Sequence, residues 1–89
     1  MMVIHRYPLS FRVPTPVEME IGDKMLSVGT KDGREVSLWV LHRKTGSKTA
    51  IREFAIFGTG NPIPNDAEFI GSAICEAGAL VWHVFEVFP

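Results

Sequence analysis

The segment from Ala79 to Phe88 constrains the fold more than any other, because it is apolar on both faces when it is read as a β-strand. Successive side chains of a strand point to opposite sides. The apolar positions are Leu80, Trp82 and Val84 on one side and Val81, Phe85 and Val87 on the other. Such a strand has to be covered on both faces. Its sheet must therefore close on itself, pack on a second sheet, or pair with a second copy of the chain.

The rest of the chain also has the pattern of β-strands. Turn residues separate short apolar segments at intervals of about 8 to 12 residues, as in all-β sandwiches and barrels. Before the final strand, the expected strands cover residues 2–7, 15–21, 25–30, 35–42 and 50–57. We predict one β-rich domain over residues 1–89, an antiparallel all-β sandwich or partly open barrel of six or seven strands, with 50–57 and 79–88 central. The expected core residues are Trp39, Phe54, Ile56, Leu80, Trp82 and Phe85.

Turn chemistry predicts how some of these strands are joined. Asp32-Gly33 lies between two apolar runs, which is a strong signal for a hairpin. Gly22-Asp23 and residues 44–47 are predicted to be turns, and Glu76-Ala77-Gly78 would turn the chain into the final strand. The strands on either side of Asp32-Gly33 are therefore expected to pair antiparallel.

Residues 65–77 fit two structures. Asn65 could cap a helix with Glu68 in the reciprocal position, and several apolar residues follow at helical spacing. Gly71 and the β-branched residues weaken that helix and fit a strand better. We expect a strand here, with one short helix as the alternative.

Composition limits the partners and the compartment. The chain is 46% hydrophobic and has a formal net charge of -1 at pH 7, so it is expected to fold and lacks the basic stripe of a non-specific nucleic-acid binder. No apolar run approaches the roughly 18 residues that cross a bilayer, and the run 1–4 is too short for a signal core, so no membrane partner is expected. The single cysteine, Cys75, excludes an internal disulfide and indicates a reducing, cytoplasmic setting.

The run from Phe57 to Asp66 is the one long irregular stretch that the sequence predicts. Its two glycines permit unusual backbone angles, whereas its two prolines fix φ and remove two hydrogen-bond donors. Such a loop is either a binding site or a rigid connection between strands. We expect it to be ordered and to line the principal cleft or contact surface. Its candidate binding residues are Gly58, Thr59, Gly60, Asn61, Pro62, Ile63 and Pro64.

A nucleotide site is an alternative use of this loop. Free backbone N–H groups from Gly58 to Asn61, with the Thr59 hydroxyl and the Asn61 side-chain amide, could form an anion-binding nest. A guanidinium group can bind phosphate and stack on a ring. The residues that could supply these contacts are Arg43, Arg52 and Trp39.

Catalytic and metal-binding patterns are not found in the sequence. His5, His42 and His83 lack the local spacing of a metal site, so each is expected to be a half-buried strand residue. Cys75 has no base close by in the sequence and is expected to be buried and unreactive. No cofactor and no metal are predicted, and a binding protein is favoured over an enzyme.

Several segments together give the chain a family resemblance. They are Tyr7-Pro8-Leu9, Ser37-Leu38-Trp39, Phe57-Gly58-Thr59-Gly60 with Pro62-Ile63-Pro64, Ile70-Gly71, Gly78-Ala79-Leu80-Val81 and His83-Val84-Phe85-Glu86. With this set, which spans nearly the whole chain, the sequence resembles a family of small uncharacterised proteins encoded by bacteriophages and prophages. Asn61 stands where that family more often has a histidine. The resemblance implies the cytoplasm of a bacterial host as the setting and assigns no role to any residue.

Three functions follow as expectations. The first is a small binding protein that acts stoichiometrically on a host process, such as a defence system, by occupying a protein surface. The second is a protein that sequesters a nucleotide signal molecule at a subunit interface, and the third is a structural component of a virion or its assembly. A homodimer or higher homo-oligomer is expected, because the final strand is apolar on both faces.

Overall fold

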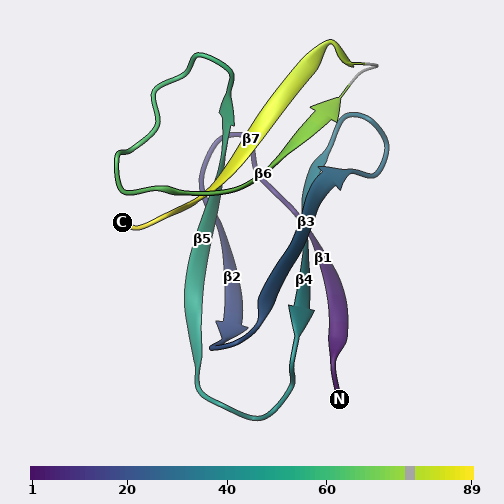
Figure 1. Ribbon diagram of the computed structural model, residues 1–89, viewed down its shortest axis with the longest axis vertical. Coiled ribbons are helices and arrows are strands. Elements are labelled where there is room, and N and C mark those ends of the chain that lie inside the picture. The colour runs from purple at the N-terminus through teal and green to yellow at the C-terminus, as the bar shows by residue number, and fades with distance from the viewer. Residues whose placement is uncertain (76–77) are drawn as a thin grey trace.

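The computed structural model describes residues 1–75 and 78–89, and these form two antiparallel β-sheets (Figure 1). The seven strands are β1 (Val3–Pro8), β2 (Thr15–Glu20), β3 (Lys24–Thr30), β4 (Val36–His42), β5 (Thr49–Gly58), β6 (Glu68–Cys75) and β7 (Leu80–Val87). One sheet has the strand order β1-β4-β3 and the other β2-β5-β7-β6. The predicted all-β fold is confirmed, and it takes the form of a small β-sandwich.

Strand β2 shows how alternation builds the core. Val17 and Met19 are buried, while Pro16 and Glu18 between them are exposed. The expected strand 15–21 would place Ile21 on the same face as these two residues, but Ile21 is 93% exposed. The strand ends at Glu20, where a turn begins with the Asp23 N–H donating to the Glu20 carbonyl. The alternation therefore stops one residue before the sequence pattern does.

The predicted hairpin between β3 and β4 is confirmed, and its loop is longer than two residues. The two strands pair antiparallel from Thr30 opposite Val36, so residues 31–35 make the connection. One carboxylate oxygen of Asp32 accepts the backbone N–H groups of Arg34 and Glu35, at 3.0 and 3.1 Å. The Thr30 hydroxyl also accepts the Gly33 N–H, at 2.7 Å, so side chains of the turn hold a wider loop than the two-residue hairpin turn.

Residues 68–75 form a strand, β6, as expected, and the helix alternative is wrong. β6 pairs with β7 from Glu68 opposite Glu86 to Cys75 opposite Leu80. Of the predicted Glu76-Ala77-Gly78 turn, residues 76 and 77 lie outside the described residues. β6 also lies close to β3 of the other sheet. A Cβ on Gly71 would meet the Val28 side chain of β3 at 3.1 Å. A side chain here would therefore push the sheets apart.

The core lies between the two sheets and differs in part from the predicted one. It consists of Leu9, Val17, Met19, Val36, Leu38, Val40, Phe54, Ala73, Cys75 and Val84, with Ile56 and Trp82 packed against it. The prediction is right for Phe54, but wrong for Leu80, which is 41% exposed at the start of β7. Trp39 and Phe85 are only half-buried. Cys75 is buried and free, as expected.

Strands β5 and β7 are the two inner strands of the four-stranded sheet, as predicted. Their register places Ile56 opposite Val84 and Phe54 opposite Glu86. Figure 1 shows the loop after β5 running out to one side of this sheet and returning close to the end of β7. The loop therefore stands where it can form a wall against the inner strands.

Candidate functional site

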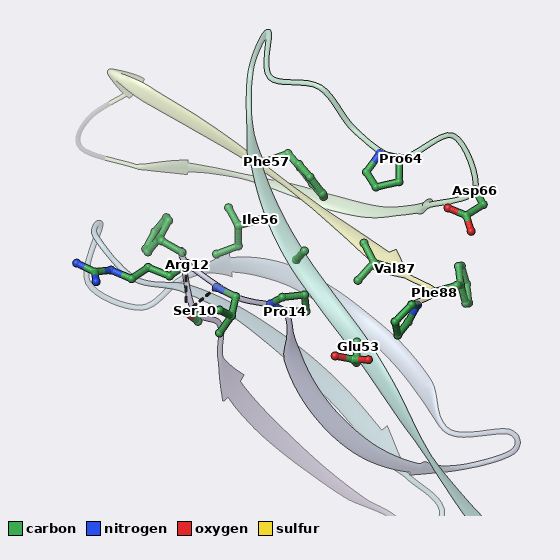
Figure 2. A pocket seen from close by; sticks show the side chains of 14 residues that line it. Ser10, Arg12, Pro14, Glu53, Ile56, Phe57, Pro64, Asp66, Val87 and Phe88 are labelled. Carbon is green, nitrogen blue, oxygen red and sulfur yellow. Dashed lines mark hydrogen bonds between the residues drawn. The ribbon is translucent and has the colours of Figure 1, made fainter.

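One cavity, which we call the loop pocket, lies where four segments meet, and its volume is about 390 Å³ (Figure 2). Its walls come from residues 10–14, from β5 at Glu53, Ala55 and Phe57, from Pro64 and Asp66, and from residues 87–89. This volume lies within the range of small-molecule and side-chain pockets, roughly 300 to 1,000 Å³. The walls are largely apolar, and Figure 2 shows Glu53 and Asp66 with Val87 and Phe88 between them in this view.

The segment 10–14 is held in one shape by hydroxyl groups. The Ser10 hydroxyl oxygen accepts the backbone N–H groups of Arg12 and Val13, at 3.1 and 3.3 Å, and the Ser10 N–H donates to the Thr15 hydroxyl oxygen. The Phe11 ring packs edge-on against Trp82, with 5.0 Å between the ring centroids. Arg12 is exposed, and in Figure 2 its guanidinium group extends away from Glu53 and Asp66.

A second feature is the outer face, by which we mean the side of the four-stranded sheet turned away from the other sheet. Its apolar side chains are Ile51, Phe57, Phe69, Ile74, Val81 and Phe85. Phe85 lies between Phe57 and Phe69, with ring centroids 5.7 and 5.4 Å apart in edge-to-face geometry. Phe69 and Ile74 nevertheless remain 60% and 64% exposed. The rings therefore form an ordered apolar surface that water still reaches.

The predicted loop residues divide between two cavities. Pro64 lines the loop pocket with Asp66, whereas Gly58, Thr59 and Asn61 line a separate cavity of about 370 Å³ beside Trp82. Of the remaining loop residues, Gly60 and Pro62 are exposed and Ile63 is half-buried.

The predicted anion-binding nest is wrong for two of its groups. The Asn61 N–H donates to the Gly58 carbonyl at 3.1 Å and closes a turn. The Thr59 hydroxyl is hydrogen-bonded to Nε2 of His83 at 2.9 Å. Both groups already have partners within the chain, so fewer donors are open to a phosphate than the sequence predicts.

The three residues proposed to hold a nucleotide lie apart from this loop. The Arg52 guanidinium donates two hydrogen bonds to the Glu86 carboxylate, one of them from Nε to Oε2 at 2.8 Å. The Arg43 side chain lies against Gly22, and Trp39 is on β4 in the other sheet. None of the three lines either cavity that the loop forms. The structure therefore does not bring them together with residues 58–61.

Two histidines make hydrogen-bonded groups that the sequence did not reveal. His83 on the outer face lies between two hydroxyls, with the Ser72 oxygen 2.8 Å from Nδ1 and the Thr59 oxygen 2.9 Å from Nε2. His42, at the end of β4, lies between the Tyr7 hydroxyl at 2.6 Å and the Asp23 carboxylate at 2.8 Å. These partners are 11 to 35 positions away in the chain, so no local spacing marks them.

The protonation pattern of the Tyr7–His42–Asp23 group follows from its contacts. Asp23 accepts the backbone N–H groups of Glu20 and Arg43, at 2.9 Å each. Burial acts to raise the pKa of Asp23, but the hydrogen bonds from Arg43, Glu20 and His42 outweigh it and lower the pKa. An ionised carboxylate only accepts hydrogen bonds, so Nδ1 of His42 donates to Asp23, and the Tyr7 hydroxyl is the partner of Nε2.

This group meets a cavity of about 270 Å³ that Glu18, Glu20, Lys44 and Thr49 also line. The Glu20 carboxylate accepts hydrogen bonds from the 45–46 turn, and Glu18 accepts one from Thr49. The polar groups around it are thus largely paired with one another, which is the arrangement of a structural network. His5 packs edge-on against His42 with ring centroids 5.5 Å apart, but the described residues contain no group of three or more metal-ligating side chains.

The fold and these surfaces define a small β-sandwich domain with an apolar outer face and a preformed pocket. Its sequence matches, over residues 1–89, a family described as a domain of unknown function, DUF7352, and the chain belongs to that family. Comparison with curated proteins and with solved structures gives no match. Among the described residues, no helix is long and apolar enough to cross a membrane.

Proposed function

We propose that this protein is a small binding domain that acts by occupying the surface of a host protein. The observation that carries the proposal is the outer face, where large apolar side chains lie in fixed positions and stay exposed. Ordered aromatic groups at a surface are the usual anchors of protein–protein contacts, because they bury much area at little cost in side-chain entropy.

The resemblance to phage and prophage proteins supplies the setting for this proposal. Small proteins of that kind commonly act stoichiometrically on a host process, and a host-defence protein is a fitting target for a domain of this size. The partner should present a largely apolar surface, because aromatic and aliphatic side chains dominate the outer face, and its polar side chains His83 and Ser72 are hydrogen-bonded to each other.

A capture experiment with matched variants tests the proposal. Tagged wild-type protein, Phe69→Ser and Leu26→Ser are incubated with lysate of a bacterial host, and the retained proteins are quantified. Leu26 is the control, since it is an exposed apolar residue on β3, outside the outer face, at 47% exposure. We expect one host protein in stoichiometric amount with the wild type and Leu26→Ser, and its loss with Phe69→Ser.

The same experiment can reject the proposal. If folded wild-type protein retains no host protein, or if Phe69→Ser and Leu26→Ser retain a partner equally, the outer face is not the binding surface. Circular dichroism of each variant establishes that the fold is intact, so a lost partner reports on the surface and not on stability.

A further inference from the structure

The loop pocket contains negative charge that the described residues do not neutralise. Glu53 and Asp66 both line it, and the ion pairs within residues 1–75 and 78–89 involve other carboxylates. Beside them the walls are apolar, formed by Phe57, Val87 and Phe88. Glu53 is half-buried against these walls, where its charge is less screened and attracts a cation more strongly than in open water, while Asp66 is exposed. The pocket therefore fits a cationic side chain that arrives with an apolar neighbour.

The chain itself presents such a pair at the rim of the same pocket. Arg12 and Val13 are exposed, Val13 at 63%, and the Ser10 hydroxyl fixes the backbone of both. The Arg12 guanidinium extends away from the pocket of its own chain (Figure 2) and forms no ion pair within the described residues. A guanidinium group suits this pocket, since it pairs with carboxylates and stacks on aromatic rings.

We propose that the loop pocket receives Arg12 and Val13 of a second copy of this chain, and that two such contacts form a symmetric dimer. A two-fold interface requires a surface that is complementary to itself. Here the donor segment 10–14 is also a wall of the acceptor pocket, so an axis passing beside the pocket forms both contacts together. The fixed shape of the segment lowers the entropy lost on association.

The dimer contact adjoins the host contact, because Phe57 lines the loop pocket and also belongs to the outer face. The dimer depends on Arg12 and the carboxylates of Glu53 and Asp66, whereas the host contact is centred on Phe69, which does not line the pocket. The two can therefore fail separately, and the Phe69→Ser variant tells them apart.

Charge reversal provides the test, with mass measured by light scattering or sedimentation at high micromolar protein. Wild-type protein should have twice the chain mass of 9.9 kDa, with weaker dimerisation at high salt. Arg12→Glu and the double variant Glu53→Lys with Asp66→Lys should each raise the dissociation constant about tenfold or more. Mixing these two variants should restore the dimer, because each acidic group then meets a basic one in both contacts.

Several results would overturn the inference. A monomeric wild-type protein, a dimer that survives both charge reversals, or a mixture that fails to associate would each do so. If Phe69→Ser abolishes the dimer while Arg12→Glu leaves it intact, the copies meet through the outer face and the pocket plays no part. Lys24→Glu is the control for a change of net charge alone, since Lys24 is exposed on β3, outside the pocket.

Discussion

Strands β4 and β7 have similar sequences and different surroundings. Both are inner strands of their sheets and carry apolar side chains on both faces. Every residue of β4 is buried or half-buried, whereas Leu80 and Val81 of β7 are exposed and its outer face is reached by water. A run that is apolar on both faces therefore identifies an inner strand and leaves open whether its second face is covered.

The neighbouring strands account for this difference. On the second face of β4, Arg6 of β1 reaches across to bond the Ser37 hydroxyl at 3.0 Å and to pair with Glu35. Long polar side chains thus lie over that face and leave their charged ends in water. On the outer face of β7 the neighbours are the rings of Phe57 and Phe69, which pack on Phe85 but cannot cover it completely.

The largest loss of unfolding free energy should come from a substitution on the inner side of the four-stranded sheet. Phe54 is fully buried and its ring belongs to the core, so Phe54→Ala should cost about 3 to 5 kcal/mol of unfolding free energy. Phe69→Ala on the outer face should cost far less, because its ring is 60% exposed. Urea unfolding of both variants measures the difference, and equal losses would show that the outer face is part of the core.

The second largest loss of stability is expected at the ion pair near the C-terminal end of β7. The Glu86 side chain is 6% exposed and depends on Arg52, whose side chain is 31% exposed. Arg52→Met removes the charge and keeps much of the side-chain volume, so it leaves a buried carboxylate unpaired and should cost about 3 kcal/mol. The control is Arg34→Met in the exposed 31–35 turn, which should leave the denaturation midpoint unchanged. Stability unaffected by Arg52→Met would mean that Glu86 finds another partner.

Phe54 and Arg52 also show how much of the structure could be predicted from the sequence. Period-two alternation and the positions of the turns give the strands, the inner position of β5 and β7, and the burial of Phe54, because these depend on local pattern. The exposure of Leu80 and the half-buried state of Trp39 depend on what other strands place over them. Arg52 illustrates the same limit, since the carboxylate that it pairs with, Glu86, is 34 positions away in the chain. No local signal indicates that its charge is already paired.

The candidate site was predicted in part for the same reason. The loop after Phe57 is irregular and lines cavities, which follows from its prolines and glycines. The segment 10–14, however, was not predicted, although it forms the opposite wall of the loop pocket. Its sequence suggests only a connection, and its importance appears when the fold places it beside Asp66. A long-range juxtaposition of this kind requires the topology.

A smaller effect on stability is expected from Tyr7, which contacts His42 at the end of β4. Burial and the charge of Asp23 raise the pKa of Tyr7 above 10.0. A raised pKa in the folded state means that stability is complete below about pH 10 and declines as the pH rises through the folded value. Tyr7 is the only tyrosine, so phenolate absorbance reports it directly and should give a midpoint above that of the unfolded chain.

The variant Tyr7→Phe tests the contribution of this hydroxyl group to stability. It leaves Nε2 of His42 without its hydrogen-bond partner and should cost about 1 kcal/mol near neutral pH. It should also reduce the loss of stability at alkaline pH, which the other titrating groups would still cause in part. An unchanged alkaline slope would mean that Tyr7 is not shielded in the folded protein.

The smallest effect on stability is expected in the loop after β5, where Thr59 and Asn61 line the second cavity beside Trp82. Both are exposed, and the Thr59 hydroxyl bonds to His83 at the surface, so Thr59→Ala with Asn61→Ala should change the unfolding free energy by no more than about 0.5 kcal/mol. If the loop contributes to a contact, partner binding should fall in the capture experiment while the melting temperature stays the same. If the loop only connects β5 to β6, both measurements stay at the wild-type value. Binding unchanged beside a Phe69→Ser variant that binds nothing would confine the contact to the aromatic residues of the outer face and leave the loop a purely structural role.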